Sequence, residues 1–164
     1  MVSSDANFVY EVRKETWLNT YPDKKHNITK QDILKKFQNK EERIKKIKHD
    51  IKTKNYGFNG LVIEVNSELV GFIITFKKNE KLFIISLYIL PRYQNYGLGS
   101  RLLKEILRNT HDDLWLEVAI YNQKAINFYR KFGFKLVPNS QFNYKLTESK
   151  NIPVILMMRK QGVT

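Results

Sequence analysis

The sequence predicts a mixed α/β fold in which helices cover both faces of one β-sheet. Three observations lead to this prediction. Through the first fifty residues, apolar side chains recur every three or four positions, which is typical of amphipathic helices. Three β-branched and aromatic runs separated by short polar turns then predict an antiparallel meander. Helix and strand patterns alternate in the remainder, so we expect the 164 residues (1–164) to form a single domain.

Two helical regions are expected before the sheet. The first spans Ala6 to Tyr21, after a cap signal at Ser3–Asp5, and Pro22 ends it. The second has an apolar stripe between lysines, formed by Ile33, Leu34, Phe37, Ile44, Ile47 and Ile51.

The later elements follow in chain order. The meander strands are expected at Leu61–Val65, Val70–Phe76 and Leu82–Leu90, and a helix follows from Leu98. The remaining elements are a strand at Leu114–Ile120, a helix at Asn122–Phe132 stopped by Gly133, and strands at Phe134–Val137 and Ile152–Met158.

Composition limits the chemistry. Without cysteine, and with three scattered histidines, the chain offers no thiolate nucleophile or zinc–thiolate site, and we expect no metal. The N-terminus lacks the features of a signal peptide and no apolar run approaches ~18 residues, so a cytoplasmic protein that does not engage a membrane is expected.

The charge is strongly positive and unevenly distributed. The formal net charge is +13, and Lys24 to Lys54 holds twelve bases against four acids. These lysines are interpreted either as the solvated face of an amphipathic helix or as a surface for a polyanion. A basic nucleic-acid-binding domain is a weaker hypothesis, because no helix-turn-helix, RRM or KH motif is present, and we expect no nucleic-acid partner.

A glycine-punctuated loop precedes the helix at Leu98. In the segment from Pro91 to Arg101, Gly97 and Gly99 leave backbone N–H groups uncovered at a helix N-terminus, which favours a pyrophosphate. The alternative is a plain turn with a glycine near the helix start. The segment is neither a Walker A loop nor a Rossmann fingerprint.

Two motifs in this order resemble the GCN5-related N-acetyltransferase (GNAT) family. Its Gln/Arg-x-x-Gly-x-Gly/Ala motif is matched by Gln94, Gly97 and Gly99. Its more specific Asn-x-x-Ala-x-x-x-Tyr-x-x-x-Gly-Phe motif is matched by Asn122, Ala125, Tyr129, Gly133 and Phe134. The resemblance implies a GNAT-type mixed sheet, an antiparallel meander plus a splayed parallel pair, and an acetyl-CoA:amine N-acetyltransferase that binds acetyl-CoA as cosubstrate in the splay.

The resemblance also implies the residues that bind acetyl-CoA. The backbone of the third meander strand would pair with the pantetheine arm, and Asn122 would bond that arm from the partner strand's end. Tyr129 would lie beside the thioester. Arg92, Arg101 and Lys131 are possible partners of the 3′-phosphate, with solvated surface as the alternative. The strand and pyrophosphate-binding residues are Leu87, Tyr88, Ile89, Gln94, Asn95, Tyr96, Gly97, Leu98, Gly99 and Ser100.

Two residues are expected to move protons. Tyr129 occupies the position of the family's general acid, although a packed core tyrosine is the alternative for this position. In similar bacterial ribosomal-protein N-terminal acetyltransferases, the glutamate of a Trp-Leu-Glu-Val stretch is the proposed base, and Glu117 matches it twelve positions before Tyr129. One-sided burial in the splay would raise the pKa of this carboxyl. Ordered water is the alternative base.

The chain departs from the family pattern at its start. Only Met1 and Val2 precede the cap signal, so we expect the family's first strand to be missing or vestigial. Either the sheet opens near Leu61 or the reading frame begins upstream of Met1. Family acceptor walls come from the first two helices and from the segment between Asn139 and Lys150, so the departure affects substrate choice.

The acceptor amine stays open at this point. The net positive charge disfavours a polyamine unless Glu11, Glu15 and Asp23 gather into an acidic cluster. Glu15 to Tyr21 does resemble polyamine-acetylating relatives. A small amine, an amino acid or a peptide N-terminus are equally open, and a homodimer is possible. The alternative to an enzyme working by direct attack in a ternary complex is a non-catalytic acyl-CoA sensor with a closed acceptor cleft.

Overall fold

The computed structural model describes residues 1–54 and 57–161 and contains one seven-stranded sheet. Its order is β1-β2-β3-β4-β7-β5, and β6 pairs with β7. The strands are β1 (Asn59–Val65), β2 (Glu68–Lys78), β3 (Lys81–Ile89), β4 (Leu114–Ala119), β5 (Lys135–Leu136), β6 (Phe142–Lys145) and β7 (Asn151–Arg159). The helices are α1 (Ala6–Thr20), α2 (Lys30–Lys36), α3 (Lys40–Thr53), α4 (Leu98–Arg108) and α5 (Gln123–Arg130), with short 3-10 turns at Ser3–Asp5 and Pro91–Tyr93.

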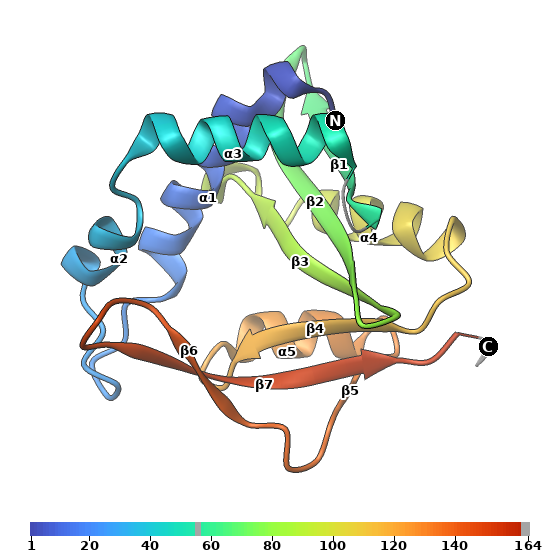
Figure 1. Cartoon of the computed structure of the whole chain (residues 1–164). Helices are drawn as coiled ribbons and strands as arrows, with labels where there is room; N and C mark the ends of the chain where they lie inside the picture. Colours follow the sequence, from blue (N-terminus) through green and yellow to red (C-terminus); the bar gives the residue numbers. More distant parts are fainter. Residues whose placement is uncertain (55–56, 162–164) are drawn as a thin grey trace.

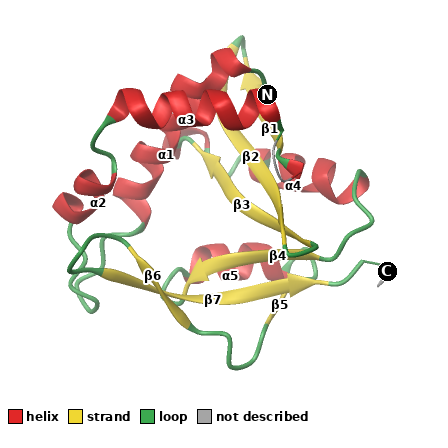
Figure 2. Ribbon diagram, in the orientation of Figure 1, coloured by secondary structure: helices red, strands yellow, loops and turns green. Residues whose placement is uncertain are grey.

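Helices cover both faces of the sheet, which confirms the predicted fold class (Figures 1 and 2). On one face, Val9 and Val12 of α1 pack against Phe72 and Ile74 of β2. On the other face, α4 and α5 bury their apolar stripes against β3, β4 and β7. Among the described helices, none is both long enough and apolar enough to cross a membrane.

The antiparallel meander is confirmed and its turns are tight. Asn66 and Ser67 connect β1 to β2, and Asn79 and Glu80 connect β2 to β3. All four residues have a positive φ, as both central positions of a type I′ hairpin turn require. The sheet opens with β1, because in the described chain no strand precedes α1. This agrees with the expectation of a missing first strand.

Strands β3 and β4 form the parallel pair, and they separate soon after they meet. Their pairing runs from Leu82 with Leu114 to Ile84 with Leu116. Beyond this point Ser86 pairs only with β2, and Glu117 pairs only with β7. Figure 1 shows the two strands together at one end and diverging toward α1 at the other. The register of β2 and β3 shifts between Ile74 and Thr75, which bends β3 at the same level.

The N-terminal helices differ from the expectation in two details. The second helical region is two helices, because Asn39 adopts a left-handed conformation between α2 and α3. Thr29 and Asp32 form a capping box that fixes the start of α2. Asp5 does not cap α1 with its side chain. Its carboxylate instead accepts a hydrogen bond from the Val2 amide at 2.7 Å and closes the preceding 3-10 turn.

The C-terminal strands also differ from the expectation. The strand predicted at Phe134–Val137 is only two residues long, because Phe134 turns into the core beneath α5. Strand β6 lies between Asn139 and Lys150, in the segment that the sequence predicts as a loop. It pairs with β7 in an antiparallel register from Phe142 with Val154 to Lys145 with Asn151. Its side chains are largely exposed, and its alternation of Phe142 and Tyr144 with polar residues is only four residues long.

Candidate functional site

A cleft of about 430 Å³ opens where β3 and β4 separate. Its walls come from the C-terminal half of β3, the loop before α4, the start of α4, the end of β4, α5 and the last turn of α1. Its lining includes the following residues that the sequence singled out: Leu87, Tyr88, Ile89, Gln94, Asn95, Gly97, Leu98, Gly99, Ser100, Glu117, Asn122 and Tyr129. The structure therefore brings together residues that are spread over more than forty positions of the chain.

The loop before α4 is shaped by left-handed residues. Asn95 has a φ of 70° and Gly97, the N-cap of α4, has a φ of 75°. A Cβ at Gly97 would meet no atom within 4 Å, so its backbone conformation, not lack of space, favours glycine. The first amides of α4 have no partner within the helix and face the cleft together with the positive end of the helix dipole. This arrangement suits a phosphate group.

Gln94 joins the loop to both neighbouring elements. Its Nε2 donates to the carbonyl of Ile89 at 3.1 Å, and its Oε1 accepts from Lys124 Nζ at 2.8 Å. Lys124, in the first turn of α5, is a cleft-lining cation that the sequence analysis missed, although it lies within the Asn-x-x-Ala motif. Tyr96 is the exception among the predicted loop residues. Its side chain is 75% exposed and lies outside the cleft lining.

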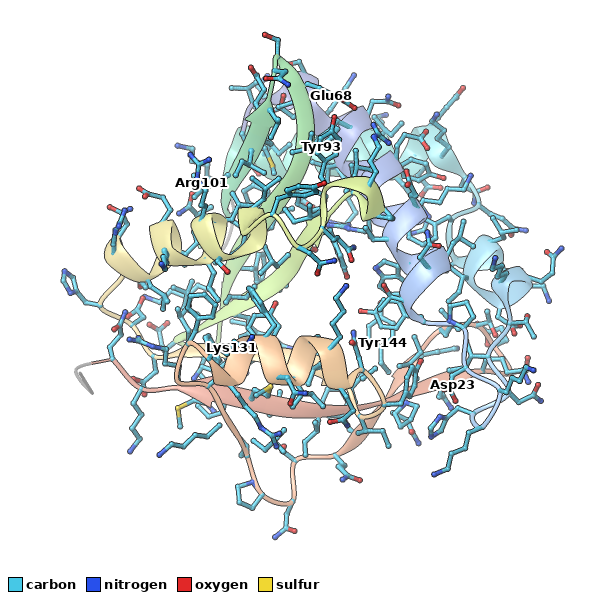
Figure 3. The ribbon with its side chains drawn as sticks, turned by 180° about the vertical axis from the view of Figure 1, so that it is seen from behind. Asp23, Glu68, Tyr93, Arg101, Lys131 and Tyr144 are labelled. Carbon is cyan, nitrogen blue, oxygen red and sulfur yellow. The ribbon has the colours of Figure 1, made fainter. Side chains whose placement is uncertain are left out.

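The three basic residues considered for the 3′-phosphate do not line the cleft. Arg92 forms an ion pair with Glu68, which also accepts a hydrogen bond from Tyr93. In Figure 3, Arg101 lies on the outer side of α4, and Lys131 lies at the end of α5. Among the described side chains, Lys124 is the cation that does reach the cleft.

Asn122 and Tyr129 lie at opposite ends of α5. Asn122 caps the helix, because its Oδ1 accepts from the Ala125 amide at 3.1 Å, and this leaves its Nδ2 group for a ligand. Tyr129 packs edge-to-face against Phe128 and Phe134 and is 9% exposed. No hydrogen-bond partner of its hydroxyl is found in the described part of the chain. Burial raises the pKa of Tyr129 far above its usual value, so the phenol stays protonated at neutral pH.

Glu117 lies across the cleft from the end of β3. Strand alternation places it on the same face as Ala119, toward α1, while Leu116 and Val118 face α5. Its side chain is exposed to the cleft. Partial burial raises the pKa of the carboxyl, and the positive charge of Lys78 opposes this shift. The direction agrees with the expectation for a carboxyl at the splay.

An aromatic wall on the α1 side of the cleft is formed by Tyr21 and Tyr88, which contact further aromatic residues outside the cleft lining. These residues were not predicted as a group from the sequence. Trp17 Nε1 donates to the hydroxyl of Tyr88 at 2.8 Å, and Tyr121 donates to the carbonyl of Tyr21 at 2.9 Å. Burial raises the pKa of Tyr21 and of Tyr88, so both phenols are neutral. Tyr144 of β6 lies beside Trp17, with ring centroids 6.2 Å apart. The aromatic residues that recur at the end of α1 and in β6 were the sequence signal from which this group could have been predicted.

The acidic cluster that a polyamine acceptor would require is not formed by Glu11, Glu15 and Asp23. Glu11 forms an ion pair with Lys40, and Asp23 pairs with His26 at 2.8 Å. Glu15 is exposed, and none of the three carboxylates lines the cleft. Figure 3 shows Asp23 well away from α4, in the turn that follows α1. Within residues 1–54 and 57–161, Glu117 is therefore the one carboxylate that lines the cleft, which disfavours a polyamine with several positive charges.

Comparison with known proteins identifies close relatives of this architecture. The model of the acetyltransferase (GNAT) family matches residues 7–134. N-alpha-acetyltransferase 50 of Danio rerio is 32% identical over 84 residues, which cover 48% of this chain and 50% of that protein. The chain thus spans about half the length of the curated relatives that it matches.

Two solved structures share the fold along almost the whole chain. PaiA N-acetyltransferase from Thermoplasma acidophilum, in complex with coenzyme A, superposes with a TM-score of 0.70 at 22% identity and covers 98% of this chain and 95% of its own. The ribosomal-protein-S18-alanine N-acetyltransferase from Escherichia coli gives a TM-score of 0.67 at 19% identity and covers 100% of this chain and 92% of its own.

Proposed function

Because the chain belongs to the acetyltransferase (GNAT) family, we propose that it transfers the acetyl group of acetyl-CoA directly to a primary amine within a ternary complex. One observation carries the proposal. A continuous cleft joins the N-terminus of α4, which suits a pyrophosphate, to a carboxylate and a phenol at the splay of the sheet. The chain has no cysteine to hold an acetyl group, which favours direct attack.

The residues present suit coenzyme A. The amides of Gly97 to Ser100 and the ammonium of Lys124 would hold the pyrophosphate, and the Nδ2 group of Asn122 would bond the pantetheine arm. The unpaired edge of β3 from Leu87 to Ile89 offers backbone groups to the same arm. The thioester that acetyl-CoA supplies would then lie where the pairing of β3 and β4 ends.

Two proton transfers accompany the reaction. The incoming amine must lose a proton, and Glu117, whose pKa is raised by partial burial, is the proposed base. The departing thiolate must gain a proton or a hydrogen bond, and Tyr129 is the proposed donor. Its high pKa makes full proton transfer to a thiolate, with a pKa of about 8.5, unfavourable in water. Poor solvation in the cleft would raise the pKa of the thiol, which reduces the difference between the two pKa values.

We favour a peptide N-terminus as the acceptor. The names of two relatives specify an N-alpha-acetyltransferase and an acetyltransferase of a ribosomal-protein alanine. The aromatic wall offers neutral phenols and ring faces to a peptide, and the missing acidic cluster disfavours a polyamine. Small amines stay in the test as alternative acceptors.

The experiment combines binding and turnover. Calorimetry with acetyl-CoA measures the cofactor site, and release of free CoA thiol is followed with peptides of varied first residue, free amino acids, spermidine and simple amines. Turnover with at least one peptide, lowered by Tyr129→Phe, is expected. Binding without turnover on any amine would instead support an acyl-CoA sensor, and absence of binding would reject both.

A further inference from the structure

A partly buried arginine without a carboxylate partner lies behind the splay. Arg13 Nη2 of α1 donates to Ser86 Oγ of β3 at 3.1 Å, and its guanidinium lies over the ring of Phe72, 5.8 Å from the ring centroid. Its Nε is shut off from solvent and has no hydrogen-bond partner in the described part of the chain. Arg13 forms no ion pair with any described carboxylate.

The surroundings of Arg13 leave its charge uncompensated. The repulsion from Arg43 outweighs the attraction of Asp50, and the other neighbours are the phenol groups of Tyr88 and Tyr144. Burial lowers the pKa of the guanidinium, which nevertheless remains protonated at any physiological pH. A buried cation without a counter-charge costs stability. Such a cost is expected where the protein must stabilise negative charge on a ligand.

Ser86 is the link between this cation and the cleft. Its side chain is 6% exposed and lines the cleft. A hydroxyl can accept two hydrogen bonds and donate one. Because Ser86 Oγ accepts from Arg13, its own hydrogen must point elsewhere, and no acceptor for it is found among the described residues. The positive charge behind the oxygen strengthens the hydroxyl as a donor.

The position of Ser86 in the sheet is as informative as its contacts. The last paired residues of the two strands are Ile84 and Leu116. Ser86 on β3 and Glu117 on β4 follow this pair and both face α1. The mouth of the splay therefore has a carboxylate on one side and a hydroxyl backed by a guanidinium on the other.

We propose that Ser86, backed by Arg13, donates a hydrogen bond to the thioester oxygen as negative charge develops on it. The inference rests on the proposed acetyl transfer and assigns Ser86 as a catalytic residue and Arg13 as a positioning residue. In the step, the amine nitrogen forms a bond to the thioester carbon, and the C=O π pair moves to the oxygen. The resulting ammonium faces Glu117, which takes a proton, and the oxyanion faces Ser86. When the C=O bond forms again, the C–S bond breaks and the thiolate is protonated from Tyr129.

The first test separates catalysis from binding. With an acceptor found in the panel, Ser86→Ala is expected to lower kcat roughly 100-fold. The acetyl-CoA dissociation constant should stay unchanged, whereas the melting temperature should fall because Arg13 loses its hydrogen-bond acceptor. Arg13→Gln should lower kcat in the same direction, and Arg13→Lys, which keeps the charge, should lose less. Arg108→Gln is the matched control, because Arg108 is exposed and pairs with Glu105 far from the cleft. A wild-type kcat in Ser86→Ala overturns the inference.

The second test does not depend on turnover or on the acceptor. S-carboxymethyl-CoA places a carboxylate near the thioester oxygen, and S-acetonyl-CoA is its neutral counterpart. Calorimetry should show that the wild type binds the anionic analogue more tightly, and that Arg13→Gln reduces this preference roughly tenfold while Arg108→Gln retains it. An equal preference in wild type and Arg13→Gln overturns the inference alone. If neither analogue binds the wild type, the proposed function fails, and the inference fails with it.

Discussion

The left-handed conformation of Gly97 makes the loop before α4 testable by one added methyl group. Gly97→Ala forces an L residue to adopt a φ of 75°, which costs about 1–2 kcal/mol. Alanine also lowers the conformational entropy of the unfolded chain, which offsets about 0.4–1 kcal/mol of this cost. The net loss of stability is about 1 kcal/mol, and the melting temperature should fall by about 2–4 °C. No clash adds to this cost, since the new Cβ would meet no atom within 4 Å.

The same substitution should weaken the binding of CoA more than it weakens the fold. If the loop relaxes to a negative φ, the amides at the start of α4 no longer point into the cleft. One lost hydrogen bond to a charged phosphate costs about 1.5–3 kcal/mol, which corresponds to a loss of affinity of roughly tenfold or more. Calorimetry with CoA and thermal unfolding measure the two effects separately.

Two matched variants control for the added side chain. Asn is tolerated in the left-handed region, as Asn95 shows in the same loop, so Gly97→Asn should keep most of the stability and affinity. Gly99→Ala, in the first turn of α4, places its Cβ 3.7 Å from Phe128 Cζ of α5, an ordinary van der Waals contact, and should leave the melting temperature unchanged or raise it. The reasoning is refuted if Gly97→Ala matches Gly97→Asn in both melting temperature and CoA affinity.

Three further predictions follow from the cleft. Glu117→Gln should lower kcat roughly 100-fold and remove the acid limb of the pH–rate profile, which the raised pKa places above the usual value of about 4.3. Because the folded state favours the protonated carboxyl, Glu117 lowers the free energy of unfolding as the pH rises from the unfolded pKa of this group to its folded pKa. Glu117→Gln should therefore have a higher melting temperature than the wild type at neutral pH and the same melting temperature at low pH. Tyr129→Phe should lower kcat roughly 100-fold at constant acetyl-CoA affinity, and an unchanged kcat would leave Tyr129 as a packing residue. Lys124→Gln should weaken CoA binding roughly tenfold in low salt and less at high salt, whereas Lys131→Gln should leave it unchanged in both.

The strands of the sheet and the loop proposed to bind the cofactor can be predicted from the sequence, because the conformational preferences of neighbouring residues determine them. The type I′ turns around Asn66 and Asn79 need residues that tolerate a positive φ, and the apolar runs beside them form strands in many contexts. The loop at Gly97 likewise carries its own conformational signal. Glu117 could be placed on the correct face from alternation alone, since the strand period is two.

The other side of the cleft depends on contacts between distant residues. Strand β6 is defined by its pairing with β7, because the alternation of Phe142 and Tyr144 with Asn143 and Lys145 is too short and too exposed to predict a strand by itself. The bond from Arg13 to Ser86 joins positions 73 residues apart and has no local signal. Whether Glu11, Glu15 and Asp23 gather into an acidic cluster also stays open in the sequence, since the ion pair of Glu11 with Lys40 depends on how α1 and α3 pack.

The electrostatics of the proposed reaction depend on a few buried or cleft-facing groups and not on the net charge of the chain. The lysines of α3 are largely exposed, so water and salt screen them from the splay. Arg13 lies behind the protein wall, where the effective dielectric constant is lower and one charge acts more strongly on a neighbouring oxygen. With Glu117 on the opposite strand, the cleft presents opposite charges to the two ends of the adduct that forms when an amine attacks a thioester. This separation of charge across the splay explains why an uncompensated arginine can be kept in the fold despite its cost.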